Sequence, residues 1–265
     1  MDVRLLGPVE VTLDGRRVPL GPPQRHAVLA ALAVDADRPV SLRTMIERVW
    51  DDPPDRATDS LYAHIARLRQ ALTGTGVGIA RRGGGYALEV DPERVDAHRF
   101  RRLTRQAQNA RDDTVRAALL AEAMELWRGA PLTGVPGDWA ARMRYSIEQQ
   151  FVGALATWAQ AHLRQGRPDM VVAELTPLVP HYPLAEPLAN MLMRGLWALG
   201  RTAEAVALYA RLRGYLADRL GVEPGPELRA LHLRMLRGDA EPLVRTGLRA
   251  QPRDLLLAQV SESVR

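Results

Sequence analysis

The stretch DRATDSLYAHIARLRQAL, residues 55–72, decides the fold of the N-terminal part of this chain. Its apolar residues recur at helical spacing, which predicts an amphipathic helix with one buried face. The buried residues are expected to be Leu61, Ile65, Leu68 and Leu72. Because successive residues turn by about 100° in a helix, the residues that point most directly outward are Asp59, Ala63, Arg67 and Gln70. The residues that flank this outward face are Arg56, Ser60, His64 and Arg69.

The region that follows is basic over a long stretch of sequence. No acid occurs between Ser60 and Leu88, and the basic residues there other than His64 are Arg67, Arg69, Arg81 and Arg82. Residues 79–90, IARRGGGYALEV, predict a β-hairpin with glycines at its tip. A helix arginine can bridge two acceptors on guanine, and an arginine on a slim hairpin can enter a minor groove.

These signals have a plainer interpretation as well, which is a solvated surface helix and a hairpin with incidental charge. Taken alone, the helix favours the plain interpretation. The helix and the hairpin together favour binding to duplex DNA, with Ser60 and Arg69 beside phosphates. A nucleotide-binding loop is not expected, because the glycines lack the lysine and Ser/Thr of a P-loop, and no GxGxxG follows a strand.

The elements before this helix complete a recognisable order. Residues 2–20 alternate like short strands around the turn signal Asp14-Gly15. A helix is expected near 23–34, after two prolines, and a second at 42–50 with Ser41 as its N-cap. Arg43 lies in the first turn of that second helix. This helix start can be interpreted as a phosphate contact, because its free backbone N–H groups suit a phosphate, or as a plain helix cap. Strands, three helices and a hairpin form the layout of a winged helix-turn-helix preceded by a small sheet.

The pattern becomes entirely helical after residues 91–97, which we interpret as a linker. Amphipathic stretches lie near 97–110, 113–128, 138–165, 168–181, 186–199, 202–219 and 225–237. Gly166-Arg167 and Gly200-Arg201 stand about 34 residues apart, which is the period of tetratricopeptide-type helix pairs. We therefore expect a mainly α protein with a small β part: a winged-helix domain at 1–92, a tetratricopeptide-like helical domain at 97–237, and a tail at 238–265.

Composition narrows the functional classes. The net charge is +5 and every Lys/Arg position is arginine, which a GC-rich genome explains without any ligand. Residues 1–95 carry as many acids as arginines, so the surplus lies in the helical half. There is no cysteine, no apolar run that would cross a membrane, and no signal-peptide pattern at the N-terminus. The six histidines show no metal-ligand spacing and no GxSxG element occurs, so neither an enzyme nor a metal or cofactor site is expected.

The chain resembles the Streptomyces antibiotic regulatory protein family. HIARLRQAL (64–72) and RGGGYAL (82–88) resemble the winged-helix domain of OmpR-type regulators. Three further segments resemble the bacterial transcriptional activation domain: LWRGAPLTGVPGDWA (126–140), HYPLAEPLANMLMRGLWALGRTAEAVALYARLR (181–213) and LADRLGVEPGPELRALHLRML (216–236). Together these matches extend the resemblance over about residues 1–237.

The resemblance implies a cytoplasmic, nucleoid-associated bacterial activator of a secondary-metabolite gene cluster. Its implied partners are double-stranded promoter DNA with tandem repeats, RNA polymerase holoenzyme and a second copy of the chain on DNA, and no membrane. Ala63, His64 and Arg67 would then face bases, whereas Arg69 and Arg82 would meet phosphate or the minor groove. The loop of Trp50, Asp51, Asp52 and Asp55 would touch polymerase. Asp59 departs from the family, in which a basic residue is common at that position. An alternative is a tetratricopeptide-like adaptor that binds a peptide, with an accessory N-terminal domain.

Overall fold

The computed structural model describes residues 1–239, and these fall into two compact units. The first unit runs from Met1 to Ala161, and the second begins at His162. The expected tail lies outside the described residues from position 240 onward. In the part of the chain that the structure describes, no helix combines the length and the apolar character that a membrane crossing requires.

The chain begins with a small antiparallel sheet, as the alternation of residues 2–20 predicted. Its strands are β1 (Asp2–Arg4), β2 (Glu10–Leu13) and β3 (Arg16–Arg17), in that spatial order. The turn between β2 and β3 has positive φ at both central residues, Asp14 (50°) and Gly15 (79°). This conformation matches the twist of a tight hairpin and explains why an Asp-Gly pair stands there.

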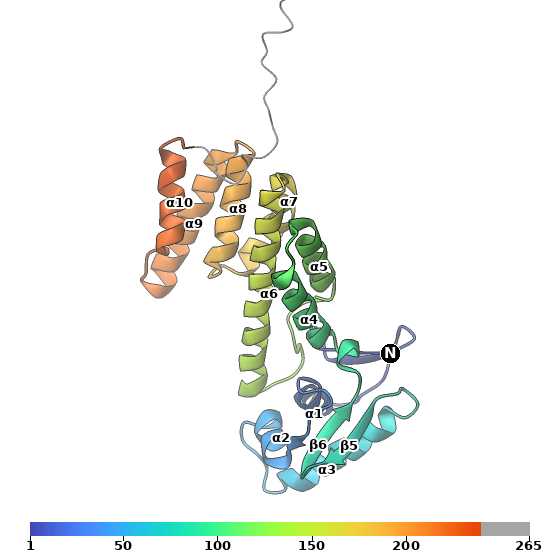
Figure 1. The fold of residues 1–265 in the computed structure, drawn as a ribbon. Coiled ribbons are helices and arrows are strands. Elements are labelled where there is room, and N and C mark those ends of the chain that lie inside the picture. Colours follow the sequence, from blue (N-terminus) through green and yellow to red (C-terminus); the bar gives the residue numbers. More distant parts are fainter. Residues whose placement is uncertain (240–265) are drawn as a thin grey trace, which may run out of the picture. The chain divides into compact units, whose positions relative to one another are not determined.

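The winged helix-turn-helix follows, and Figure 1 shows its helices beside the hairpin. It comprises α1 (Pro23–Ala33), β4 (Val40–Ser41), α2 (Leu42–Val49), α3 (Ala57–Ala71), β5 (Gly78–Arg82) and β6 (Gly85–Glu89). The strands β5 and β6 form the hairpin, and β4 pairs with β6 to complete a second sheet. All four expected seam residues of α3 are buried, and Ser41 caps α2 by accepting a hydrogen bond from the Thr44 amide at 3.1 Å.

Residues 91–97 do not form the linker that we expected. They form a short 3-10 helix, η1 (Pro92–Arg94), and the start of α4 (Asp96–Asn109). The Asp96 carboxylate is buried and accepts hydrogen bonds from the Leu5 and Leu6 amides at 2.7 and 3.1 Å. Burial raises the pKa of Asp96, whereas these amides and Arg128 lower it. A side chain that satisfies two distant amides ties this segment to the first sheet, which sequence periodicity does not reveal.

The first unit also contains α5 (Asp113–Glu125) and most of α6 (Asp138–Arg164). The winged helix and these helices therefore share one compact unit, while the expected division into domains at 1–92 and 97–237 stays a prediction. Trp127 stacks on Phe151 with ring centroids 4.0 Å apart, and Phe100 lies beside both rings. Trp158 is 5% exposed and belongs to the core, whereas Trp127 and Trp139 are half-buried.

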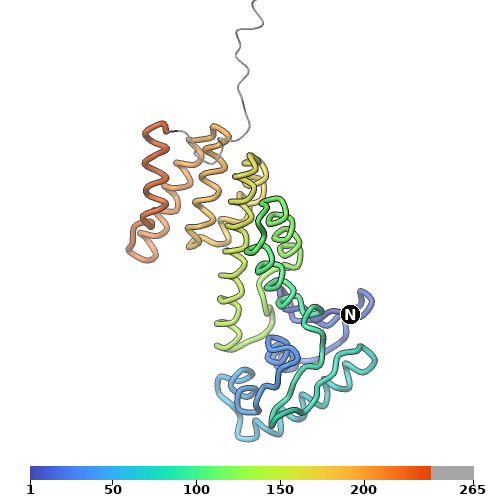
Figure 2. The backbone as a smooth tube through the Cα atoms, viewed as in Figure 1, coloured from blue at the N-terminus to red at the C-terminus, as the bar shows by residue number. Residues whose placement is uncertain are grey.

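The second unit is a series of antiparallel helices, whose path can be followed in Figure 2. They are α7 (Pro168–Leu178), η2 (Val179–His181), α8 (Glu186–Ala198), α9 (Thr202–Leu220) and α10 (Pro226–Leu236). The two glycines of the expected repeat, Gly166 and Gly200, have φ of 70° and 74°. Each is followed by an arginine whose amide bonds back to the preceding helix. The repeat thus uses the same glycine turn twice.

Candidate nucleic-acid interface

The outward face of α3 is open to solvent, as the spacing predicted. Asp59, Ala63, Arg67 and Gln70 are all exposed. The Arg67 Nη1 lies 3.4 Å from Gln70 Oε1, and no acid pairs with Arg67 in the described residues. A long guanidinium beside an amide group, next to the small Ala63, presents several hydrogen-bond donors on an accessible helix face.

Arg69 lies on the wing side of α3 and is held by the hairpin. Its Nε donates to the Ile79 carbonyl at 2.8 Å, and its guanidinium stacks over the Tyr86 ring at 5.4 Å. These contacts fix the position of β5 and β6 against α3. Arg69 therefore has a structural role that the helical wheel did not predict, while its other guanidinium donors stay available.

The two wing arginines differ in their partners. Arg82 forms ion pairs with Asp37 at 3.0 Å and Glu89 at 2.7 Å, and these acids raise its pKa. Arg81 is exposed and has no acid partner within residues 1–239. Because strand residues alternate between faces, Arg81 shares the face of its register partner Tyr86, and Arg82 points to the opposite face. The wing therefore presents Arg81 unpaired, whereas Arg82 is engaged by two acids.

The stretch that lacks acids in sequence does not lack them in space. Besides the acids that pair with Arg82, Asp59 pairs with Arg56 at 2.9 Å. Arg43, in the first turn of α2, is similarly paired with Glu47 at 2.9 Å. All these pairs are exposed, so water and salt screen them and a phosphate can compete for the arginine.

The remaining candidates on α3 are less exposed. Ser60 and His64 are half-buried. The His64 ring packs near Trp50 with centroids 6.2 Å apart. Burial, with a contribution from Arg25, lowers the pKa of His64 and leaves a neutral ring at neutral pH.

The loop between α2 and α3 divides into a tethered part and an open part. Asp51 Oδ1 accepts a 2.8 Å hydrogen bond from the Asp138 amide at the start of α6. Nearby, Arg48 stacks over the Trp139 ring at 5.5 Å. Asp52 and Asp55 are exposed and have no ion pair among the described residues. The four loop candidates therefore do not form one free acidic surface.

Sequence reasoning overlooked Tyr62, which is 38% exposed on α3. Its ring meets the edge of Tyr86 from the wing, with centroids 6.4 Å apart. An aromatic residue on the polar side of an amphipathic helix was the signal that could have found it. Tyr62 lies where the helix face and the wing meet, and it offers a phenolic hydroxyl to that junction.

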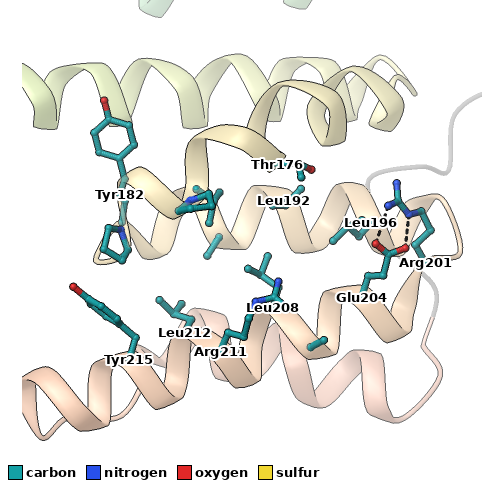
Figure 3. A pocket seen from close by; sticks show the side chains of 16 residues that line it. Thr176, Tyr182, Leu192, Leu196, Arg201, Glu204, Leu208, Arg211, Leu212 and Tyr215 are labelled. Carbon is teal, nitrogen blue, oxygen red and sulfur yellow. Dashed lines mark hydrogen bonds and ion pairs between the residues drawn. The ribbon is translucent and has the colours of Figure 1, made fainter. Parts of the chain in front are cut away.

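The second unit holds a separate, largely apolar groove with a volume of about 350 Å³. Figure 3 shows Leu192, Leu208 and Leu212 along its walls, with Tyr182 and Tyr215 at one end. At the other end Arg201 and Glu204 form a two-point ion pair at 2.7 and 2.8 Å. In the described chain no cluster of three or more histidines and acids is arranged to hold a metal.

Comparison with known proteins agrees with this architecture. Residues 15–88 match the model of the transcriptional regulatory protein C-terminal domain. Residues 95–236, more than half of the chain, match the bacterial transcriptional activator domain. The solved structure of Mycobacterium tuberculosis EmbR in complex with a low affinity phosphopeptide superposes with a TM-score of 0.81 at 32% identity. That superposition covers 92% of this chain and 66% of that one.

Two relatives from Streptomyces coelicolor extend the comparison. The transcriptional regulator RedD is 34% identical over 95% of this chain and 75% of its own length. The regulatory protein AfsR is 38% identical over 89% of this chain, which spans only 24% of AfsR. This chain likewise spans only 63% of the length of M. tuberculosis EmbR, at 33% identity.

A winged helix joined to a bacterial transcriptional activator domain defines a class of transcriptional regulators. Within that class, the chain belongs to the Streptomyces antibiotic regulatory protein family, as do AfsR and RedD.

Proposed function

We propose that this protein activates transcription by binding direct repeats in a promoter through α3 and the β5–β6 wing. The observation that carries the proposal is the exposed α3 face around Arg67, which no other described element covers and which lies beside the wing. In this arrangement α3 enters the major groove, where Ala63 and Arg67 meet base edges and His64 lies at the rim. Gln70 and Tyr62 border the same contact.

The flanking cations position the protein on the phosphate backbone. Arg81 reaches the minor groove from the wing, and Arg82 exchanges an exposed acid partner for phosphate. Arg43, Arg56, Ser60 and Arg69 contact phosphates on either side of the helix. Two copies of the chain bind adjacent repeats about one helical turn apart, so that both lie on one face of the duplex.

The regulated genes belong to a secondary-metabolite cluster, such as one for antibiotic biosynthesis. Membership of the family supports this assignment, and the names of the relatives support regulation in general. The α2–α3 loop contacts RNA polymerase, with Asp52 and Asp55 as the open acids. Trp50 and Asp51 hold the loop in place, since Asp51 is bonded to the start of α6.

The experiment is a fluorescence anisotropy titration of promoter fragments and single-base variants of each repeat. Arg67→Ala is expected to lose roughly 1–3 kcal/mol of discrimination at one base pair. Arg81→Ala and Arg82→Ala should weaken binding to all fragments alike and flatten the dependence on salt. Arg111→Ala, which removes an exposed arginine between α4 and α5, is the matched control. If Arg67→Ala and Arg81→Ala both bind like the parent protein, this assignment of the reading face is wrong.

A second function is favoured by the groove of the second unit, which would suit an apolar peptide held by an adaptor. Ala207→Trp fills this groove from its exposed side, and Ala210→Trp, also exposed on α9, is the control. If the protein is an adaptor, Ala207→Trp should abolish binding of its protein partner. The parent protein should bind that partner even when promoter DNA is absent. An activator instead co-purifies with polymerase subunits in the presence of promoter DNA.

A further inference from the structure

The first unit contains a cleft that the proposed DNA-reading face does not use. The cleft has a volume of about 860 Å³ and lies between residues 34–38, which follow α1, and the helices α4 and α6. Cavities of several hundred Å³ are the usual size for small-molecule sites in proteins. The cleft is therefore large enough to enclose a ligand.

The charge of this cleft is strongly positive. Arg38, Arg101 and Arg105 line it, and the acid among its lining residues is Asp35. The Asp35 carboxylate is already engaged, because it accepts a 2.6 Å hydrogen bond from Arg48. The three lining arginines thus have no acid partner within salt-bridge distance in residues 1–239.

Arg101 is the most informative of the three, because it is half-buried. Its Nε reaches only the neutral Gln150 Oε1, at 3.3 Å. Burial lowers the pKa of Arg101, the nearby Arg105 lowers it further, and Asp35 raises it. A guanidinium carries five N–H donors, and the Arg101 Nη1 and Nη2 form no hydrogen bond with the described residues. An anion in the cleft would supply acceptors for them.

A second observation points to the same place. The Thr104 Oγ1 is buried and has no hydrogen-bond partner among the described residues. Arg101, Thr104, Arg105 and Gln108 all line the cleft, and they are spaced as one face of a helix. Helix α4 therefore presents the polar side chains of Arg101, Arg105 and Gln108 toward one cavity.

We propose that this cleft binds a small ligand that carries a phosphate group, held by Arg101 and Arg105 of α4. Arg38 approaches the same group from the loop after α1. Several cations suit a multiply charged anion, and guanidinium forks match phosphate oxygens. The apolar lining residues Ala36 and Pro92 offer a surface to the uncharged part of the ligand.

The loop that lines the cleft also contacts the wing. Asp37 belongs to the loop that lines the cleft, and its carboxylate pairs with Arg82 of β5 at 3.0 Å. Its amide also donates to the Leu88 carbonyl of β6 at 2.9 Å. Any effect of the ligand on DNA binding rests on the proposed function, but ligand binding itself does not.

The test is isothermal titration calorimetry of the full chain at low salt, with inorganic pyrophosphate and with ADP as probes. We expect saturable binding to the parent protein and a decrease of at least about tenfold in affinity for Arg101→Gln and Arg105→Gln. Arg105 is exposed, so its variant keeps the fold. Arg16→Gln, which removes the same charge from β3, should bind like the parent, and so should Arg67→Ala.

Two results overturn the proposal. One is the absence of saturable binding for both probes, and the other is an equal loss of affinity in Arg16→Gln. In the first case, if Arg105→Gln also weakens binding to a short DNA duplex, the anion of this cleft is the DNA backbone. A failure of Arg67→Ala to change base preference would contradict the proposed function and leave the calorimetric result standing.

Discussion

Arg67 and Arg69 stand two positions apart on α3, and the structure predicts opposite consequences when each is replaced by alanine. Arg69 connects α3 to the wing through the 2.8 Å bond from its Nε to the Ile79 carbonyl and through its stacking over Tyr86. Arg67 has only the exposed 3.4 Å contact with Gln70. The pair therefore separates a stabilising arginine from one that is free to contact DNA.

The magnitude follows from these contacts. A partly exposed hydrogen bond from a charged donor contributes about 1 kcal/mol, and an exposed cation–π contact about 0.5–1 kcal/mol. Arg69→Ala should therefore lower the free energy of unfolding by roughly 1–2 kcal/mol. In a unit of this size that corresponds to a decrease in Tm of about 2–8 °C. Arg67→Ala should change the free energy of unfolding by less than about 0.5 kcal/mol.

Thermal unfolding followed by circular dichroism measures the loss of stability in Arg69→Ala. Amide hydrogen exchange of residues 78–89 shows whether that loss lies in the wing hairpin. Arg69→Ala should speed exchange in the wing hairpin, while Arg67→Ala leaves the hairpin protected. When DNA binding is measured well below the Tm, the two variants should rank in the opposite order. Arg67→Ala should then lose more base discrimination than Arg69→Ala. Equal Tm and equal hairpin protection in the two variants would refute the structural role of Arg69.

Three further outcomes are expected. Asp51→Ala removes the acceptor for the Asp138 amide and should lower the free energy of unfolding by about 1 kcal/mol, as loss of a helix cap does. Urea unfolding measures this loss, and Asp52→Ala, which should be neutral, is the control. Arg82→Ala breaks two exposed ion pairs and should cost less than about 1 kcal/mol, with the difference vanishing at high salt in the same assay. Burial lowers the pKa of His98 from 6.5, so the unfolded state binds more protons and the free energy of unfolding should fall as pH drops below 6.5. His98→Gln should flatten that decline in a pH series of urea titrations.

The helices and the hairpin could be predicted because their signals are local. The seam of α3, the Ser41 cap and the glycine turns at 166 and 200 each depend on residues a few positions apart. The structure places them as expected. The exposed α3 face followed from the same periodicity.

What the sequence could not provide are the partners that arrive from distant positions. Periodicity says which side of α3 is wet, but not that Arg69 bonds to Ile79 or that Arg82 meets Asp37. The segment at 91–97, for which the sequence predicts a linker, instead forms η1 and the start of α4. The buried Asp96 satisfies two amides some ninety positions earlier, a pairing that only the folded chain brings together.

The most direct measurement of the DNA-reading face uses the absence of cysteine in this chain. Ala63→Cys introduces a single thiol on the exposed side of α3, to which an iron chelate that cleaves DNA can be attached. If α3 lies in the major groove, cleavage should concentrate within each promoter repeat. The same chelate at Arg111→Cys, on the loop between α4 and α5, should give no focused cleavage there. Equal or absent cleavage from position 63, with promoter binding intact, would contradict the placement of α3 on DNA.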